Sequence, residues 1–587
     1  MNTRYYKEEL QYLRELGQDF ARQHPHLAPM LAEASSDPDV ERVLQGVAYL
    51  TGAIRERLDD DLPELTQTLL EMTWPHYLRP LPSFSIVEFR HPTKPMVTTT
   101  QSIPRFETEL DSVKVDGTAC RFRTCYDVTF QPLRVRQASL DPAGRDSIRI
   151  SLAVLGGAKL ASLDLDSLRF YLHGDVANGA DLFLWLMRRL DFVELRVPEG
   201  RRVRSLKLPR HPSPLRPVGF EESEALEPYP LQSFPGFGML REFFTLPQKY
   251  LFFDLVGLGA LRDLAPETEF EVVFHFTERL PEGLRVDEER FRLHCTPVVN
   301  LMSMGAEPIV VSPERTSYPV RASDPAPANY EVFSVDSVIG LLHGRSERRE
   351  YRPFFAFRHG LGDERQPIFY KTSRVPGAGH PNSDCYISFV SLDAKDALPD
   401  AETISMELTC TNRTLAEQLR PGDIKLHTDT SPEFSEFQNL TPPTRSVLPP
   451  LEGDLLWRLI SHLSLNYLSL ASVEGLRAVI RLYDLHASYD RQEARALENR
   501  LEAIQSVETT NETRLLKGAP VRGVRVDITL DNEGFASEGE MYLFASVMEE
   551  FLALYVSINS FSHLVVHAAK SGETYDWTPR IGHQTIL

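Results

Sequence analysis

The chain has 587 residues, of which 42% are hydrophobic, and a formal net charge of −20. This length and apolar content predict roughly three or four domains with cores of their own and argue against a disordered protein. The acidic excess argues against a general nucleic-acid or anionic-membrane binder, because both surfaces would repel such a chain.

Sequence features of secretion and of membrane anchoring are missing. The five cysteines are odd in number and scattered, which favours a reducing compartment over a disulfide framework. The N-terminus has no apolar segment after a basic start, and no window of 18 apolar residues occurs. We therefore expect a soluble, cytoplasmic protein.

The first eighty residues show the apolar spacing of helices. One seam, with positions four and three residues apart, consists of Tyr6, Leu10, Leu13, Gly17 and Phe20. A second helix is expected after Asp37-Pro38, with a stripe of Val40, Val43, Leu44, Val47, Leu50, Ile54 and Leu58. A third is expected between Asp61 and Trp74. Short connections between the three predict a helical bundle over residues 1–80.

From residue 81 the apolar period changes from 3.6 to 2. Alternating runs predict half-buried antiparallel strands at residues 148–154, 270–276, 290–295 and 404–408. One helix is expected over residues 181–190. We expect a β-rich domain over residues 81–320 and a second over residues 321–450, with proline-rich candidate linkers at residues 321–329 and 431–450.

The C-terminal region, residues 451–587, is expected to be a mixed α/β domain. Helical patterns occur at residues 454–470 and 491–504, and a strand pattern follows at residues 524–528. The last helix carries Phe544, Val547, Phe551, Tyr555 and Ile558. The predicted fold class is α+β: an N-terminal helical bundle, a long β-rich body of antiparallel strands and a mixed α/β C-terminal region.

The glycines in YLFFDLVGLGALRD, residues 250–263, are the strongest candidate for a cofactor loop. Gly257 and Gly259 match a dinucleotide fingerprint, but Arg262 stands where a third glycine is needed. An alternating strand pattern follows, where the fingerprint requires a helix. We interpret the segment as a strand that ends in a tight turn.

Other motifs of chemistry are equally weak. Cys120 and Cys125 lack the C-x-x-C spacing of a zinc site, and no HExxH, GK[ST] or G-x-S-x-G occurs. We expect no catalytic, cofactor or metal site, and no enzyme. The alternative is a cytosolic hydrolase with a site built from distant loops, which rests only on the 83 carboxylates of the chain.

Long segments of the sequence resemble the TssF family, also called ImpG or VasA, in the family's order. The first is DPDVERVLQGVAYLTGAIRERLDDDLPELTQTLLEMTWPHYLRPLPSFSI, and the second is VGFEESEALEPYPLQSFPGFGMLREFFTLPQKYLFFDL. Further segments are FRLHCTPVVNLMSMGAEPI, LTCTNRTLAEQL, LLWRLISHLSLNYLSLA and EEFLALYVSINSFSHL. One departure is SEGEMYLFASVMEEF, which lacks a second glycine expected before the final helix.

The resemblance implies a structural role in the baseplate of a bacterial type VI secretion system, similar to the wedge proteins of contractile phage tails. It implies that two TssF chains embrace one TssG through helical segments, and that TssK and TssE complete the wedge around the VgrG spike hub. Such a baseplate lies in the cytoplasm, docked at the inner membrane without insertion, and scaffolds the sheath and inner tube. It implies no cofactor.

Within that role, Tyr6, Leu10, Leu13 and Phe20 are the candidate residues of a subunit-contact helix. The alternative is that this seam packs inside its own domain, as most amphipathic helices do. Besides TssG, a second TssF copy is a candidate partner.

Overall fold

The computed structural model describes most of the chain, in ranges separated by gaps. The described residues are 6–7, 10–11, 13, 42–51, 63–93, 97–141, 144–158, 160, 163, 165–199, 202–230, 233–261, 269–312, 314–342, 348–354, 369–377, 382–390, 402–451, 472–516, 518–557 and 559–582. The chain divides into two compact units, Met1–Met72 with Pro450–Ile460, and Thr73–Pro449 with Ser461–Leu587.

Helices are present near the N-terminus, where the apolar spacing predicted them. The backbone is helical at the described positions between 6 and 13, over residues 42–51 and in α3 (Pro63–Thr73). Proline is favourable at the start of α3, because the first N–H groups of a helix have no partner within it. The packing of these helices into one bundle stays a prediction, and the helix expected over residues 454–470 lies outside the described residues.

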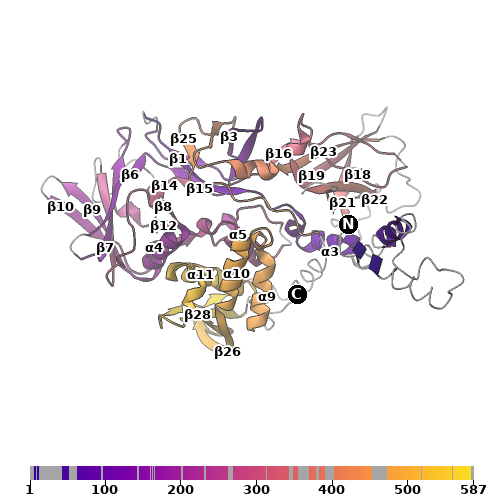
Figure 1. Ribbon diagram of the computed structural model, residues 1–587. Helices are drawn as coiled ribbons and strands as arrows, with labels where there is room; N and C mark the ends of the chain where they lie inside the picture. Colours follow the sequence, from indigo (N-terminus) through magenta and orange to yellow (C-terminus); the bar gives the residue numbers. More distant parts are fainter. Residues whose placement is uncertain are drawn as a thin grey trace. The chain divides into compact units, whose positions relative to one another are not determined.

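Strands, mostly in antiparallel pairs, are the most frequent regular elements of the second unit, as the period of two predicted (Figure 1). A six-stranded sheet has the order β24 (Ile424–His427), β3 (Glu109–Val115), β4 (Thr118–Thr124), β15 (Cys295–Val299), β1 (Phe84–Arg90) and β25 (Glu436–Asn439). A five-stranded sheet has the order β10 (Arg202–Lys207), β9 (Leu190–Glu199), β13 (Glu269–Phe276), β7 (Ser147–Val154) and β6 (Leu133–Leu140). A four-stranded sheet has the order β11 (Leu215–Val218), β12 (Phe252–Val256), β8 (Ser167–Leu172) and β14 (Phe291–Leu293). β2 (Gln101–Ile103) pairs with β5 (Val128–Phe130).

An eight-stranded sheet contains the strands between residues 302 and 411. Its order is β16 (Met302–Gly305), β23 (Glu402–Thr411), β19 (Glu331–Leu342), β20 (Arg348–Pro353), β21 (Phe369–Pro376), β22 (Ser383–Val390) and β18 (Tyr318–Pro319), and β17 (Ile309–Val310) also pairs with β23. The predicted alternation at residues 404–408 is confirmed, because Ile404, Met406 and Leu408 point into a buried cluster.

The six-stranded sheet joins strands that are far apart in the sequence. β24 and β25 come from the region expected as a second β-rich domain, residues 321–450, yet they pair with strands of the region 81–320. The eight-stranded sheet begins before residue 321, with β16. Alternation within a strand does not specify its neighbours, because pairing is set by contacts between distant segments.

The segment 431–450 is packed against the body, so its prediction as a linker was wrong. It contains β25, and Leu81 forms a bridge with Val447. Thr441 Oγ1 accepts a hydrogen bond from the N–H of Ile86 at 3.0 Å. The prolines of the segment lie outside β25, so none of them has to donate a ladder hydrogen bond. The expected linker at residues 321–329 is likewise attached, since Ala322 is buried and bridges to Ala306.

The alternating run at residues 290–295 forms two strands, where the sequence predicted one. β14 ends at Leu293, β15 begins at Cys295, and His294 between them has a φ of 55°. A residue in this left-handed region changes the direction of the chain. The two strands therefore join different sheets, and the alternation continues across the break because both strands face cores.

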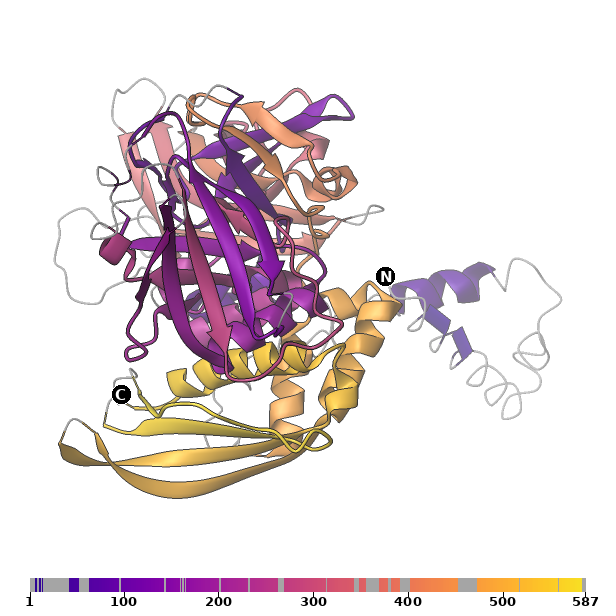
Figure 2. The ribbon, with the colours of Figure 1, turned by 90° about the vertical axis from the view of Figure 1, so that its left-hand side faces the viewer.

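The C-terminal region is mixed α/β, as predicted (Figure 2). Its sheet has the order β26 (Ile504–Leu516), β27 (Ala519–Leu530), β28 (Phe561–Ala568) and β29 (Thr574–Asp576), and β30 (Arg580–Ile581) pairs with β28. β27 and β28 are parallel and are joined through α11 (Glu538–Leu554), the last predicted helix. The remaining helices of this region are α9 (Val473–Tyr483) and α10 (Arg491–Glu502).

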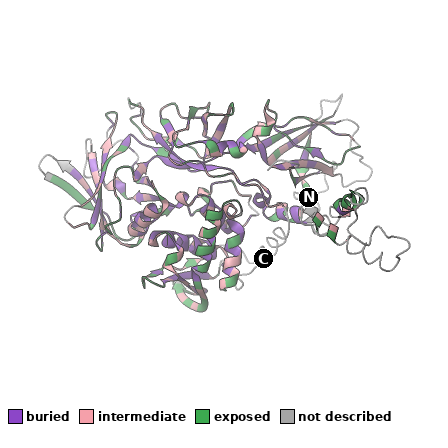
Figure 3. Ribbon diagram, in the orientation of Figure 1, coloured by how far each residue is buried: buried purple, intermediate pink, exposed green. Residues whose placement is uncertain are grey.

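Helix α11 is buried along almost its whole length and contacts the body through α4 (Val176–Arg188) (Figure 3). At Gly539 a Cβ atom would lie 2.2 Å from the backbone carbon of Ala180. The N–H of Gly539 donates to Asp181 Oδ1 at 2.8 Å. Glycine is needed here for close approach of the two helices.

Short 3-10 segments connect many of these elements. They are η2 (Pro75–Leu78), η4 (Glu222–Glu224), η5 (Pro247–Tyr250), η6 (Leu258–Ala260), η7 (Pro327–Asn329), η9 (Arg413–Gln418), η10 (His486–Ser488) and η11 (Asn532–Gly534).

Helix α5 (Pro235–Thr245) connects the body with the C-terminal helices. The Phe237 ring is stacked against Trp74, with ring centroids 5.1 Å apart, and against Tyr483, with centroids 4.9 Å apart, and the Trp74 and Tyr483 centroids are themselves 5.3 Å apart. All three side chains are buried. Aromatic pairs contribute roughly 0.5–1.5 kcal/mol beyond the burial of their area. This stack therefore holds three segments together that are distant in the sequence.

A buried ion pair lies beside the aromatic stack. Arg241 Nη2 donates to Glu227 Oε2 at 2.8 Å, and Arg241 Nη1 donates to the carbonyl of His76 at 3.0 Å. Burial raises the pKa of Glu227, and the adjacent guanidinium opposes that shift. Burial lowers the pKa of His76 well below its usual value, so the imidazole stays neutral.

A second buried pair continues this network. Lys249 donates to Glu242 Oε2, while Glu242 Oε1 accepts from the N–H of Leu226 at 2.9 Å and from the hydroxyl of Tyr229 at 3.0 Å. Buried charges are tolerated when paired and hydrogen-bonded, as here. The two pairs fix α5 against the segment 224–229.

Substitution of Arg241→Met should destabilise the protein by about 3–5 kcal/mol, because it leaves the Glu227 carboxylate buried without its cation. The measurement is the midpoint of thermal unfolding. The double variant Arg241→Met/Glu227→Gln should recover part of the loss, since it also removes the buried charge. Equal midpoints for the single and double variants would show that the pair does not stabilise this junction.

Glu549 on α11 should make stability depend on pH. Arg580 Nε lies 2.7 Å from Glu549 Oε1, but burial outweighs this attraction and raises the pKa of Glu549 to about 8. Between the ordinary carboxyl pKa of 4.5 and this value, the folded chain keeps a proton that the unfolded chain releases. Stability therefore falls as pH rises through this window, by at most about 1.4 kcal/mol per pH unit.

Glu549→Gln removes this ionisation and should raise the thermal midpoint at pH 8 while changing it little at pH 5. Both proteins would be melted at the two pH values in buffers of equal ionic strength. The prediction would be contradicted if the thermal midpoints of the two proteins differed by the same amount at pH 5 and at pH 8.

Candidate subunit-contact surface

The N-terminal seam lies on helical backbone at each of its described positions. Tyr6, Leu10 and Leu13 are partly buried, whereas Lys7 and Gln11 between them are exposed. The predicted amphipathic helix is therefore confirmed at these positions. Phe20, the fourth candidate residue, lies outside the described residues. The role of the seam as a subunit contact stays a prediction.

The helix over residues 42–51 presents a second apolar surface, here called the valine stripe and defined as Val43, Val47 and Leu50. The exposed fractions of these side chains are 67%, 40% and 63%. They recur at i, i+4 and i+7, so they share one face of the helix. Ala48, which is fully buried, marks a different face.

The valine stripe was predicted as part of one seven-residue apolar stripe. In the structure the described part of that stripe divides, because Leu44 is partly buried while the valine stripe faces solvent. Seven apolar positions between residues 40 and 58 fit a single helix face, which carries three to four such positions per two turns. The spacing therefore gave no sign that Val43, Val47 and Leu50 would be exposed, and their exposure comes from the structure.

The segment around Gly257 ends a strand in a tight turn, as predicted. Gly257 follows β12 with a φ of 89°, and η6 comes next. The N–H groups of Gly257 and Leu258 both donate to the carbonyl of Asp166, at 3.0 and 3.1 Å. A phosphate loop requires such N–H groups to be free for its ligand. These two are already used within the fold.

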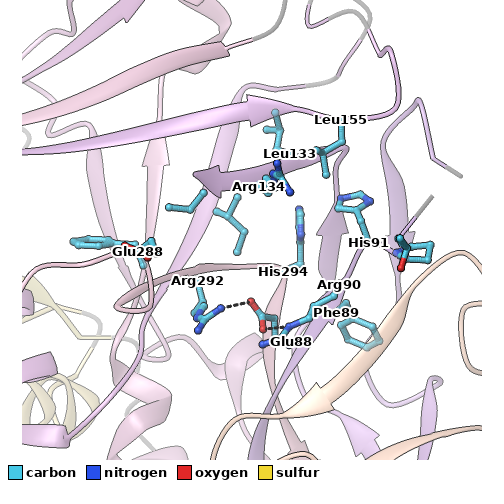
Figure 4. Close-up of a pocket in the computed structure, with 15 residues that line it drawn as sticks. Glu88, Phe89, Arg90, His91, Leu133, Arg134, Leu155, Glu288, Arg292 and His294 are labelled. Carbon is cyan, nitrogen blue, oxygen red and sulfur yellow. Dashed lines mark hydrogen bonds and ion pairs between the residues drawn. The ribbon is translucent and has the colours of Figure 1, made fainter. Parts of the chain in front are cut away.

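A cavity of about 450 Å³ lies where strands of three sheets meet (Figure 4). Its wall includes Glu88 from β1, Arg134 from β6 and Arg292 from β14. Glu88 accepts from Arg90 Nε at 2.5 Å, and its other oxygen lies 3.5 Å from Arg292 Nη1. The carboxylate is held between two cations, which favours a structural role over that of a general base.

Two histidines of the same cavity are also used by the fold. His91 Nε2 donates to the carbonyl of Gln131 at 2.8 Å, and His294 Nε2 accepts from the N–H of Gln131 at 3.2 Å. Burial lowers the pKa of both rings, that of His294 to about 3. Both rings are therefore neutral at pH 7, and both form hydrogen bonds with the backbone of Gln131. The described residues give the hydrolase alternative no observation in its favour.

All five cysteines are buried within the fold. Burial raises the pKa of Cys120 to about 11 and that of Cys125 well above its usual value. Metal ligation and nucleophilic attack need the thiolate, which these surroundings disfavour. Among the residues that the structure describes, no group of three His, Cys, Asp or Glu side chains has the arrangement of a metal site. Within the same ranges, no helix is both long and apolar enough to span a membrane.

Comparison with known proteins gives matches along the whole chain. The family described as "Type VI secretion system, TssF" matches residues 2–584. The type VI secretion system component TssF1 of Pseudomonas aeruginosa is 32% identical over 632 aligned positions, which cover 100% of both chains.

Two solved structures are also similar over the length of the chain. A chain of a cryo-electron-microscopy structure of the TssK-TssF-TssG baseplate subcomplex has a TM-score of 0.76 and 30% identity, covering 93% of this chain and 99% of that one. A chain of the baseplate complex from the type VI secretion system has a TM-score of 0.66 and 25% identity, with full coverage of both. The order of segments that resembled TssF, the α+β fold and these full-length matches agree. The chain belongs to the TssF family of type VI secretion system proteins.

Proposed function

We propose that this chain is a structural subunit of a type VI secretion baseplate and works in a complex with TssG and TssK. The observation that carries the proposal is its similarity to a chain of the TssK-TssF-TssG subcomplex, with 30% identity and a TM-score of 0.76. The proposal extends to the finer role that the family resemblance implies. Two copies would bind one TssG, TssE would complete the wedge, and wedges would surround the VgrG hub.

The same proposal places the protein in the cytoplasm, at a baseplate docked to the inner membrane, where it scaffolds the sheath and inner tube. Its contribution is shape and interface, and it requires no cofactor. A multi-sheet body with paired buried charges is suited to such a role, because a scaffold must transmit position between partners without deforming.

We infer that the N-terminal helices make the TssG contact. The valine stripe is exposed to 40–67%, and the seam of Tyr6, Leu10 and Leu13 is only partly buried. Burying a Val or Leu side chain contributes roughly 1.5–3 kcal/mol. Apolar helix faces that are exposed to solvent in the single chain therefore favour association with a helical partner.

Val43→Asp/Leu50→Asp should abolish capture of TssG in a coexpression pull-down, because two charges would have to enter an apolar contact. The fold should persist, since both side chains are largely exposed in the single chain. Val203→Asp/Leu206→Asp on β10 is the matched control. It adds the same charge at exposed apolar positions elsewhere. Equal loss of TssG in both variants would contradict a specific role of the valine stripe.

Leu10→Asp/Leu13→Asp should also prevent complex formation while the β-rich body stays folded. Mass determination of the wild-type eluate should give a complex heavier than one copy of each protein. If the variant chain becomes insoluble, the seam is internal core. If the wild-type protein elutes alone at its own mass of 66.7 kDa, the proposed function itself fails.

A further inference from the structure

The outer edge of β26 is unpaired among the described residues. β26 is the terminal strand of its sheet and pairs only with β27 (Figure 2). A bulge lies at its base, between Ile504 and Ser506, and the register then continues without interruption to Leu516. The stretch from Glu508 to Asn511 is exposed, and Leu515 is 76% exposed.

Free edges of this length are usually protected against pairing with another chain. The common devices are proline, charged side chains (above all lysine) and a bulge in the middle of the strand. The sequence of β26, IQSVETTNETRLL, contains no proline or lysine, and its only register shift is at the base, so its charged residues Glu508, Glu512 and Arg514 are the one such device it has. Three threonines and a valine favour extended backbone. The edge is therefore competent to accept one more strand.

The sequence of β26 is complementary to itself in one antiparallel register. A two-fold axis perpendicular to the sheet keeps every side chain on its own face, so a residue can oppose only positions of the same parity. With the axis at Asn511, Glu508 lies opposite Arg514 of the second copy, and this pair occurs twice. Val507 lies opposite Leu515 of the second copy, also twice. Opposite charges and apolar pairs across strands both stabilise a sheet.

Neighbouring registers are disfavoured by charge. With the axis at Thr510, Glu508 lies opposite Glu512 in both halves of the contact. With the axis at Glu512, that residue lies opposite itself. Like charges directly opposite each other destabilise a sheet. Charge therefore favours the register centred on Asn511 over the two adjacent registers.

The charged side chains are available for this pairing. Glu508 has no ion pair or side-chain hydrogen bond among the described residues. Arg514 Nε donates to Glu512 Oε1 at 2.6 Å, and its Nη2 lies 3.2 Å from His563 Nδ1. These contacts direct Arg514 over β27 towards His563 of β28, and its flexible side chain becomes available when it turns from them to the carboxylate across the new strand pair.

We propose that β26 is a self-association edge, on which β26 of a second copy of this chain adds in antiparallel orientation with its centre at Asn511. Two five-stranded sheets then become one continuous sheet of ten strands. The contact involves a short strand pair only, and it is weak in dilute solution unless other contacts bring the two copies together. This inference does not depend on the proposed TssG contact.

A cysteine at the two-fold axis tests the register. In Asn511→Cys the two new residues face each other with Cα atoms about 4.5–5.5 Å apart, which is within the range of a disulfide. The purified full-length chain is oxidised with copper(II)-phenanthroline and examined on a non-reducing gel. Background from the five native cysteines is small because all are buried. A covalent dimer is the expected result.

Two other single cysteines serve as matched controls on the same exposed edge. In the proposed register, the two copies of Gln505→Cys are about 40 Å apart, and those of Thr509→Cys are about 14 Å apart. Neither should give the dimer, whereas Thr509→Cys/Thr513→Cys should, because these positions oppose each other. Dimer formation at all positions alike, or at none, would overturn the proposal. So would crosslinking of Asn511→Cys to a coexpressed partner protein in place of the second copy.

Charge reversal in the Asn511→Cys background gives an independent measure. Glu508→Arg and Arg514→Glu should each lower the initial crosslinking rate by about tenfold, because two attractive pairs become repulsive. The combined reversal should restore the rate. Restoration would show that the effect comes from the contact between the two chains, because the combined variant also lacks the contacts that Arg514 makes within its own chain. A combined variant as slow as the singles would overturn the register.

Discussion

The Arg241–Glu227 ion pair and the aromatic stack beside it are the interactions on which the junction of the second unit depends. Both partners of the pair are almost fully buried, and neither charge can reach water. A buried charge is stable only with its partner, so the two segments that carry them must stay together. Phe237, from the same helix as Arg241, stacks on residues of the body and of α9.

Several side chains of types that often take part in catalysis are instead engaged in contacts that hold the fold together. In their neutral form His91 and His294 hydrogen-bond to the backbone of Gln131, and the five cysteine thiols are buried. The Glu88 carboxylate forms ion pairs with two arginines, Arg90 and Arg292. These residues are engaged within the fold, which suits the structural role proposed above.

The two exposed surfaces, the valine stripe and the outer edge of β26, have a physical property in common. Among the residues that the structure describes, the valine stripe presents apolar side chains to water, and the outer edge of β26 presents backbone groups without a neighbouring strand. Each is unfavourable in an isolated chain and becomes favourable in contact with another chain. The two surfaces differ in the partner they select, since a helix face favours an apolar helix and a strand edge favours another strand.

The sequence by itself determined the local structure and the family. Strands such as β7, β13 and β23, and helices α10 and α11, were predicted because side-chain period reports which face of a segment is buried. The TssF-like segments and their order along the chain were sufficient to indicate the family. Among the candidate contact residues, Tyr6, Leu10 and Leu13 were correctly assigned to an amphipathic helix.

Only the tertiary structure decided which elements meet. It placed β24 and β25 beside β1 and β3, divided the run at His294 between two sheets, and left the valine stripe and the edge of β26 uncovered. Period alone cannot distinguish an apolar face that packs within the chain from one that is left for a partner. The physical reason is that burial depends on what lies opposite, and the opposite segment is usually far away in the sequence.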